Sequence, residues 1–307
     1  MVLDGEIILS VVVSCYKQQN YIAECLNSIL TQKVNFKYEL IIADDCSPDK
    51  TREVIQRFYD KYPEKIRLLF QEKNVGAARN YIAVHNLAAG KYVAHFDGDD
   101  VMLPGKLQAQ VDVMKANPDC HIVFHRARYF SDDRSYIAET GSLFKDGDTV
   151  FFTPQELARW GTIAVHSSYT YRRSTRKTRV YTEDFMEWFF AFESIADGGV
   201  GAYINEILVE YRCNPSGSAY LSSKAGREKA YKIIIKHVAD YYNTRPEFRK
   251  DLYVQEVINI FMYIKNIRKF NLHMIKFLIT NIFSFRIHKF IEAVRVRKMV
   301  APEKKIR

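Results

Sequence analysis

Three carboxylates stand within four consecutive residues, Asp97-Gly98-Asp99-Asp100, at the end of the apolar run KYVAHFD (91–97). Carboxylate oxygens suit Mg²⁺ or Mn²⁺, which commonly bind proteins through one or two carboxylates and the phosphates of a substrate. Gly98 would let the backbone turn tightly enough for neighbouring carboxylates to face one ion. These residues predict a site for Mn²⁺ or Mg²⁺, with an ordinary surface turn as the alternative, because Asp-Gly is common in turns.

A second acidic pair, Asp44 and Asp45, ends the run YELIIADD (38–45). A carboxylate there could accept a hydrogen bond from the N–H of a nucleobase. The competing interpretation is a favourable charge at the start of the following helix, which applies more to Asp49 than to Asp44. Arg79, in the segment NVGAARN, could pair with a diphosphate, although a solvent-exposed helix face is the simpler explanation for a single arginine.

A fold must bring these groups together, and the first 130 residues indicate which fold it is. Apolar runs predict strands at 8–16, 38–45, 66–70, 91–97 and 121–130, and segments of helical spacing separate them. One such helix is predicted over Ala77–Ala89, closed by Gly90. This alternation is typical of an α/β fold with a mostly parallel sheet and helices on both faces. Ligands of such sheets bind beyond the carboxyl ends of the strands, where the acidic groups lie.

Length and composition narrow the class of protein. With 307 residues, 48% of them hydrophobic, the chain can bury a large core and form about two domains. Its five cysteines are odd in number and include no CxxC pair, which argues against a disulfide framework or a zinc ribbon. Asp4 and Glu6 precede the first apolar run, whereas a signal peptide begins with basic residues. We therefore expect a cytoplasmic protein.

Charge is distributed unevenly along the chain. Residues 221–307 carry 20 Lys+Arg and 7 Asp+Glu, a net of +13, whereas residues 1–220 have a net charge of −4. The longest uncharged stretch of the basic part, Phe277–Phe285, is far shorter than the roughly 20 residues needed to span a bilayer. A basic amphipathic helix on an anionic membrane surface, such as the inner face of the cell membrane, fits this pattern. A helical cap with ordinary solvated lysines is the alternative.

The segments, taken in order, resemble the family 2 glycosyltransferases, which have the GT-A fold. The resemblance runs through VVVSCYKQQNYIAECLNSILTQ, YELIIADDCSPDKT, NVGAARN and AHFDGDDVMLP, and more loosely through HSSYTYRRS and EILVEYRCNPSGS. It implies a GT-A domain over 1–220, divided into a nucleotide-binding half (1–130) and an acceptor half (131–220). A basic helical region over 221–307 would follow this domain.

The resemblance implies metal-dependent, inverting transfer of a sugar from a nucleoside-diphosphate sugar to an acceptor hydroxyl. The setting would be assembly of a surface polysaccharide such as a capsule or O-antigen, with a glycan or lipid-linked glycan as acceptor. UDP-sugars are the commonest donors by this resemblance, while guanosine and thymidine donors stay open. Donor-binding residues would be Ser14, Tyr16, Asp44, Asp45, Arg79, Asp97, Gly98 and Asp99, and Asp97, Asp99 and Asp100 would form the DxD motif that holds the metal.

The resemblance also places a general base in the segment YTEDFMEWFF (181–190), which offers Glu183, Asp184 and Glu187. Counting back from Tyr211-Arg212, the acid that precedes a tryptophan in similar enzymes falls nearest Glu187. We predict Glu187 as the base and Asp184 as the second choice, with acids on a helix surface as the alternative.

One departure from the family concerns the residues that meet the diphosphate or the acceptor. The family often has a histidine two residues after the arginine of its YR motif, where this chain has Asn214. Arg212 or Lys224 would then compensate. His166 and Ser167 fall where related enzymes approach the acceptor, although a single histidine is more often structural.

Two other functions compete with sugar transfer. A nucleotidyltransferase also uses carboxylates and Mg²⁺, but it would normally bring a basic, glycine-rich phosphate loop that residues 12–20 lack. The pI of about 9.1 suggests a nucleic-acid-binding or scaffold protein. The acidic first 220 residues argue against nucleic acid, because they repel phosphates unless a metal intervenes.

Overall fold

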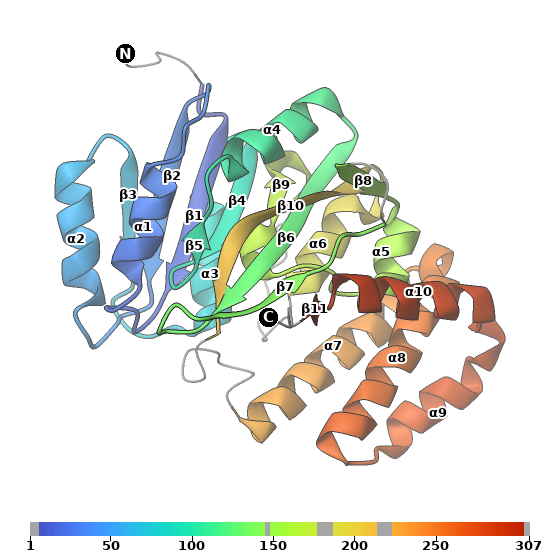
Figure 1. Ribbon diagram of the computed structural model, residues 1–307. Coiled ribbons are helices and arrows are strands. Elements are labelled where there is room, and N and C mark those ends of the chain that lie inside the picture. The colour runs from blue at the N-terminus through green and yellow to red at the C-terminus, as the bar shows by residue number, and fades with distance from the viewer. Residues whose placement is uncertain (1–5, 145–147, 177–186, 214–222, 304–307) are drawn as a thin grey trace.

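The computed structural model describes residues 6–144, 148–176, 187–213 and 223–303, which form an α/β fold around one mixed sheet (Figure 1). The main path of the sheet runs through β11 (Pro302–Glu303), β7 (Tyr136–Thr140), β6 (Cys120–Phe130), β9 (Thr170–Arg172), β4 (Tyr92–Asp97), β1 (Leu9–Cys15), β2 (Tyr38–Asp44) and β3 (Ile66–Phe70). Off this path, β10 (Val200–Arg212) pairs with β6, β5 (Val101–Met102) and β8 (Thr149–Phe152).

The half of the sheet that positions the acidic groups is parallel. β4, β1, β2 and β3 are neighbours in that order, and each pairs in parallel with the next. The predicted α/β fold with a mostly parallel sheet is thereby confirmed, with β9, β7, β8, β5 and β11 as antiparallel additions. Buried β-branched runs such as Val11-Val12-Val13 form these strands because both faces of a parallel sheet are covered.

Helices cover both faces of the sheet, and successive residues of β1 point to opposite sides. Val11 and Val13 belong to the core formed with α1 (Ile22–Leu30), α2 (Thr51–Lys61) and α4 (Lys106–Ala116). Val12 belongs to the core formed with α3 (Ala77–Asn86), α5 (Pro154–Trp160) and α6 (Glu187–Ala196).

The helix predicted over Ala77–Ala89 is shorter in the structure, and Gly90 has a different role. The helix α3 ends at Asn86, and Leu87 is its C-cap. A Cβ atom at Gly90 would lie 2.6 Å from the backbone nitrogen of Ser10 and 2.7 Å from the carbonyl carbon of Leu9. Gly90 is therefore needed for the close approach of the chain to β1, and the prediction of a helix cap at this glycine was wrong.

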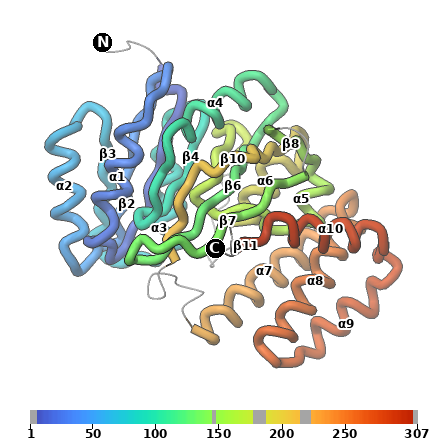
Figure 2. The backbone as a smooth tube through the Cα atoms, in the orientation of Figure 1, coloured from blue at the N-terminus to red at the C-terminus, as the bar shows by residue number. Residues whose placement is uncertain are grey.

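The predicted C-terminal helical extension is confirmed. It consists of α7 (Lys224–Thr244), α8 (Arg249–Ile267), α9 (Leu272–Thr280) and α10 (Ile287–Val300), grouped beside one end of the sheet (Figure 2). Buried residues of α7, α8 and α10 share a core with α5 and α6. Arg159 on α5 forms ion pairs with Glu292 at 2.7 Å and Asp251 at 3.1 Å. The predicted division of the chain at residue 220 stays a prediction.

Candidate active site

A cleft lies at the carboxyl ends of β1 and β4, on the side of the sheet that carries α3. Its walls come from the ends of β1 and β4, the first turns of α3 and α6, and the short 3₁₀ helix η1 (His166–Ser168). The residues that line it are Ser14, Ala77, Ala78, Tyr81, His95, Asp97, His166 and Glu187. Four of the residues predicted from the sequence, from positions 14 to 187, are thus brought into one cleft.

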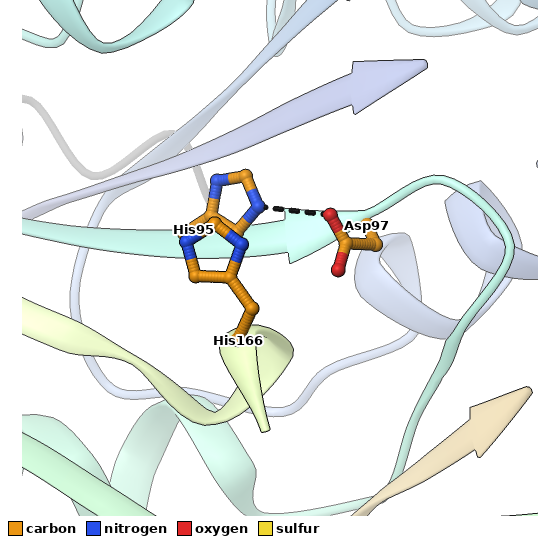
Figure 3. A group of neighbouring side chains, drawn as sticks. All are labelled: His95, Asp97 and His166. Carbon is orange, nitrogen blue, oxygen red and sulfur yellow. Dashed lines mark hydrogen bonds and ion pairs between the residues drawn. The ribbon is translucent and has the colours of Figure 1, made fainter. Parts of the chain in front are cut away.

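Asp97 is the last residue of β4 and is held in place from two sides. Its neighbour across the sheet is Ser14 on β1. One carboxylate oxygen, Oδ1, lies 3.0 Å from Nε2 of His95 (Figure 3), and the backbone N–H donates to Oγ of Ser167 at 3.0 Å. Burial alone would raise the pKa of Asp97, but the hydrogen bond and charge of His95 outweigh it and lower the pKa to about 2. Asp97 is therefore ionised at neutral pH.

The carboxyl group of Asp100 is buried and hydrogen-bonded by the protein. It is 1% exposed, its Oδ1 accepts the backbone N–H of Arg212 at 2.8 Å, and its Oδ2 accepts the hydroxyl of Ser167 at 2.6 Å. Burial, followed by the charges of Asp99 and Asp97, raises the pKa of Asp100 well above its usual value. Both oxygens of Asp100 are already engaged by the protein, so metal binding by Asp100 stays a prediction that these hydrogen bonds disfavour.

Asp99 differs from Asp100 because it is only partly covered by protein. Burial and the neighbouring charge of Asp97 raise the pKa of Asp99 to about 7. Two carboxylates that disfavour each other's charge in this way are a setting that a cation relieves. A cation between them would relieve this repulsion, and metal binding by Asp97 and Asp99 stays a prediction.

Gly98 is required at its position by close packing. A Cβ atom there would lie 2.2 Å from Oε1 of Gln18 and 3.0 Å from the side chains of Cys15 and Ile22. The tight turn that the sequence predicted at Gly98 thus brings the acidic segment against the end of β1 and the start of α1.

A second ligand set can be considered among the described residues. Nitrogen and oxygen atoms of His95, Asp97 and His166 all lie within 4.8 Å of one another. The two imidazole rings, however, are stacked, with centroids 3.8 Å apart and planes inclined by 23°. Ring-nitrogen lone pairs lie in the ring planes, so stacked rings do not aim at one ion unless a ring turns. The observed arrangement suits hydrogen bonding to Asp97 better than chelation by both histidines.

Glu187, the predicted base, lines the cleft from the first turn of α6. Its Oε1 lies 3.7 Å from Nδ1 of His166, and about a third of the side chain is exposed. Burial and the charge of Asp97 raise the pKa of Glu187 to about 7. A carboxylate poised near neutral pH and open to a cleft is suited to accept a proton. The second choice, Asp184, and Glu183 lie outside the described residues.

Of the residues predicted to bind the nucleotide, some are exposed and others are buried. Tyr16 and Arg79 are exposed, and Oγ of Ser14 accepts a hydrogen bond from Asn80 at 3.0 Å. The carboxylate of Asp44, in contrast, is fully buried and hydrogen-bonded by Ser47 and Arg52.

Asp45 is also engaged by the protein. It accepts the backbone N–H groups of Val75 at 2.7 Å and Gly76 at 2.9 Å, and so fixes the loop before α3. Base binding by Asp44 and Asp45 stays a prediction, but both carboxylates already organise the loops around the cleft.

Arg212 holds the acidic turn from behind instead of facing the cleft. Its Nε donates to the carbonyl of Asp99 at 2.8 Å, and its Nη2 donates to Glu24 at 2.7 Å. Its guanidinium also lies 4.4 Å from the ring centroid of Phe130. The side chain is 4% exposed, so Arg212 is poorly placed to compensate for the missing histidine at the diphosphate. Asn214, the residue at that family position, lies outside the described residues.

Replacing Arg212 with methionine is therefore expected to lower the free energy of unfolding by about 1.5–3 kcal/mol, because hydrogen bonds to a charged group are lost. Denaturant unfolding measures this change. Arg134→Met is the matched control: Arg134 is half exposed and pairs with Glu24 and Glu210, so its loss should cost less than about 1 kcal/mol. Equal losses in the two variants would contradict the role assigned to Arg212.

Residues that the sequence analysis did not single out complete the cleft. His95 shares a face of β4 with Asp97, because side chains two apart on a strand point the same way. The ring of Tyr81 stacks on His166 at 5.2 Å and lies 4.0 Å from the ring of His85. Period-two spacing before the acidic tetrad could have indicated His95, whereas Tyr81 reaches the cleft only through the packing of α3 against the sheet.

Comparison with known proteins identifies the chain's relatives. Residues 10–180 match the model of the family described as glycosyl transferase family 2. An uncharacterized protein of Mycobacterium tuberculosis is 35% identical over 126 residues, which are 41% of this chain and 36% of that protein. The match thus spans only about a third of that relative's length.

A Bacillus subtilis protein, provisionally named the teichuronic acid biosynthesis glycosyltransferase TuaG, is 37% identical over 107 residues, 35% of this chain and 42% of that one. Among solved structures, Staphylococcus aureus TarS 1–349 in complex with UDP-GlcNAc superposes with a TM-score of 0.66 at 19% identity. That match covers 96% of this chain and 84% of the TarS chain, and it confirms the fold.

Proposed function

This chain belongs to glycosyl transferase family 2, and on that premise we propose that it transfers a sugar from a nucleoside-diphosphate sugar to an acceptor hydroxyl. One observation carries the proposal: Asp97, ionised and fixed at the end of β4, shares a single cleft with Glu187, a carboxyl group whose pKa is about 7. The cleft thus offers an anion, Asp97, that can attract a cation, and a carboxyl group, Glu187, that can accept a proton.

Asp97 and Asp99 would hold Mn²⁺ or Mg²⁺, and the diphosphate of the donor would bind near them. Bound there, the ion would stabilise negative charge on the departing nucleoside diphosphate as a Lewis acid. Asp97 contributes through its ionised carboxylate, and Asp99 would lose its proton when a cation offsets the repulsion from Asp97. Asp100, Ser167 and Arg212 hold the turn in shape.

Glu187 would take the proton from the attacking hydroxyl. The hydroxyl oxygen forms a bond to the anomeric carbon while the bond to the diphosphate oxygen breaks, and the proton passes to the Glu187 carboxylate. Attack from the side opposite the leaving group inverts the anomeric configuration. Analysis of the product linkage by NMR, with a donor of known configuration, distinguishes inversion from retention.

The relatives support a donor class and a kind of acceptor. TarS is solved with UDP-GlcNAc and with UDP, which favours a UDP-sugar here. The name of TuaG favours an acceptor in surface-polysaccharide assembly. Thermal shift with a panel of UDP-, GDP- and dTDP-sugars plus Mn²⁺ tests the donor class, and stabilisation by UDP-sugars alone is the expected result. Release of the nucleoside diphosphate on adding a glycan acceptor tests the transfer.

We also propose that the enzyme works on the cytoplasmic face of a membrane, which it contacts through α8, α9 and α10. Among the described residues no helix combines the length and apolarity needed to cross a bilayer. The exposed large apolar side chains gather instead in this region, which holds ten of the twelve in the described part of the chain: Phe261, Ile264, Phe270, Leu272, Ile279, Ile282, Phe283, Ile287, Ile291 and Val294.

Exposed basic side chains, among them Lys276 and Arg295, lie on the same helices as these apolar side chains. Apolar side chains flanked by cations are the combination that binds anionic lipid. A second copy of the chain is a less suitable occupant, since symmetric pairing would bring the same positive charges together.

Liposome flotation checks this proposal. Wild-type protein is expected to float with anionic vesicles, and less so at high salt or with zwitterionic vesicles. The double variant Ile282→Ser/Phe283→Ser should bind at least about tenfold more weakly, because burying one large apolar side chain is worth about 1.5–3 kcal/mol. Phe151→Ser, at an exposed phenylalanine on β8, is the matched control and should bind like wild type. If vesicle binding is unchanged both at high salt and in the double variant, the membrane contact is ruled out.

A further inference from the structure

A chain of hydrogen bonds, which we call the relay, leads from Asp97 into the protein interior. Oη of Tyr171 lies 2.6 Å from Nδ1 of His85, Nε2 of His85 lies 3.0 Å from Nδ1 of His95, and Nε2 of His95 lies 3.0 Å from Oδ1 of Asp97. Tyr171, His85 and His95 are at most 7% exposed. The chain joins β9, α3 and β4. Its last hydrogen bond, from His95 to Asp97, is drawn in Figure 3.

The hydrogen bonds of this chain form a consistent set. A carboxylate oxygen accepts, so Nε2 of His95 donates to Oδ1 of Asp97. Between Nδ1 of His95 and Nε2 of His85, one nitrogen must carry the proton and the other must accept it. Nδ1 of His85 is paired with the hydroxyl of Tyr171 in the same way. Every ring nitrogen of the two histidines therefore has a hydrogen-bond partner.

We propose that Tyr171, His85 and His95 are positioning residues that lock the Asp97 carboxylate by its Oδ1 and leave Oδ2 for the cation and diphosphate. The inference rests on the proposed function and names the residues that prepare its anionic site. Ser167 fixes the Asp97 backbone N–H at 3.0 Å, while its hydroxyl is only 3.5 Å from Oδ2. Oδ1 is therefore the more firmly held oxygen, whereas Oδ2 has only the longer contact with Ser167.

A matched pair of variants separates hydrogen bonding from packing. In His95→Gln, the side-chain amide can still donate to Asp97 and its oxygen can accept from His85. His95→Met has a similar size but can do neither. If His95 contributes only packing, the two variants should bind the metal equally well. If its hydrogen bonds hold Asp97, only His95→Met should weaken metal binding.

The measurement is Mn²⁺ binding to the full chain in the presence of UDP, followed by the electron paramagnetic resonance signal of free Mn²⁺. We expect His95→Met to weaken binding by about 10–100-fold, as is typical when a residue that orients a metal ligand is lost. His95→Gln should stay near wild type. Tyr171→Phe, which removes only the hydroxyl at the far end, should weaken binding by about tenfold or less, at the lower end of that range. Circular dichroism melting verifies folding, and if His95→Met does not fold, Tyr171→Phe and His95→Gln carry the test.

The outcomes distinguish the relay from the proposed function. If wild type binds UDP with Mn²⁺ while His95→Met and Tyr171→Phe bind equally well, the relay is wrong and the proposed function stands. If His95→Gln loses binding as completely as His95→Met, the imidazole itself is a metal ligand and the positioning role is overturned. If wild type fails to bind any nucleoside diphosphate with Mn²⁺, the proposed function itself fails.

Discussion

Glu187→Gln is expected to lower the turnover of sugar transfer by about 10²–10⁴-fold, the usual contribution of a general base. Glutamine keeps the size of the side chain but cannot take the proton from the attacking hydroxyl. Donor binding should be preserved, because Glu187 is not among the residues proposed to hold the diphosphate. Steady-state kinetics with a matched donor and acceptor, together with calorimetric titration of UDP, measure the two quantities separately.

Two further variants make this prediction specific. Glu206→Gln changes an exposed glutamate on β10 that does not line the cleft, and it should leave turnover unchanged. Asp184→Asn tests the second choice for the base. A turnover loss confined to Asp184→Asn, with Glu187→Gln near wild type, would transfer the role of base to Asp184.

The same carboxyl group sets the expected pH dependence. With a pKa of about 7, Glu187 is protonated below that pH and cannot act as a base. The kcat/KM of the wild type should therefore fall about tenfold for each pH unit below 7. This acid limb should disappear in Glu187→Gln, whose residual activity is expected to be independent of that group.

Asp97→Asn is the second substitution with a large expected effect. Stabilising the charge of a leaving group through a metal is worth several kcal/mol, so we expect turnover to fall by about 10²-fold or more and to lose its response to Mn²⁺. Asp100→Asn is the matched control from the same segment, since the carboxyl group of Asp100 is buried and already hydrogen-bonded by the protein. Metal titrations of activity should show Mn²⁺ dependence in Asp100→Asn and none in Asp97→Asn; the reverse pattern would return Asp100 to the ligand set.

The parallel half of the fold was predictable because its signal is local. Strands such as β1 and β4 are continuous apolar runs, and a polar residue at the end of each marks the sheet edge. The end of α3 was not predictable in the same way. Gly90 resembles a helix cap in sequence, but its position is dictated by contact with Ser10 and Leu9, which are 80 residues away.

The site shows a similar division between local and distant information. Asp97, Gly98 and Glu187 could be identified from short segments and from the order of those segments. The roles of Asp100 and Arg212 could not, because Asp100 is enclosed by hydrogen bonds from Ser167 and from the Arg212 backbone. These contacts join residues separated by 67 and 112 positions.

The C-terminal helices pack against α5, and their contact with a membrane stays a proposal. The ion pairs of Arg159 with Glu292 and Asp251 make the helices a cap on α5, which charge counting could not reveal. The outer face nevertheless keeps apolar side chains such as Phe283, 89% exposed, for which the described part of the chain provides no cover. Periodicity indicated helices here, and only tertiary packing shows which face is left for a partner.

The central claim is that Asp97 and a divalent cation together bind the diphosphate of a nucleotide-sugar. Calorimetric titration of UDP into the wild type and into Asp97→Asn, each with Mn²⁺ and with EDTA, tests it most directly. We predict binding that requires Mn²⁺ in the wild type and little binding in Asp97→Asn under either condition. Equal affinity for UDP in all four titrations would contradict the claim.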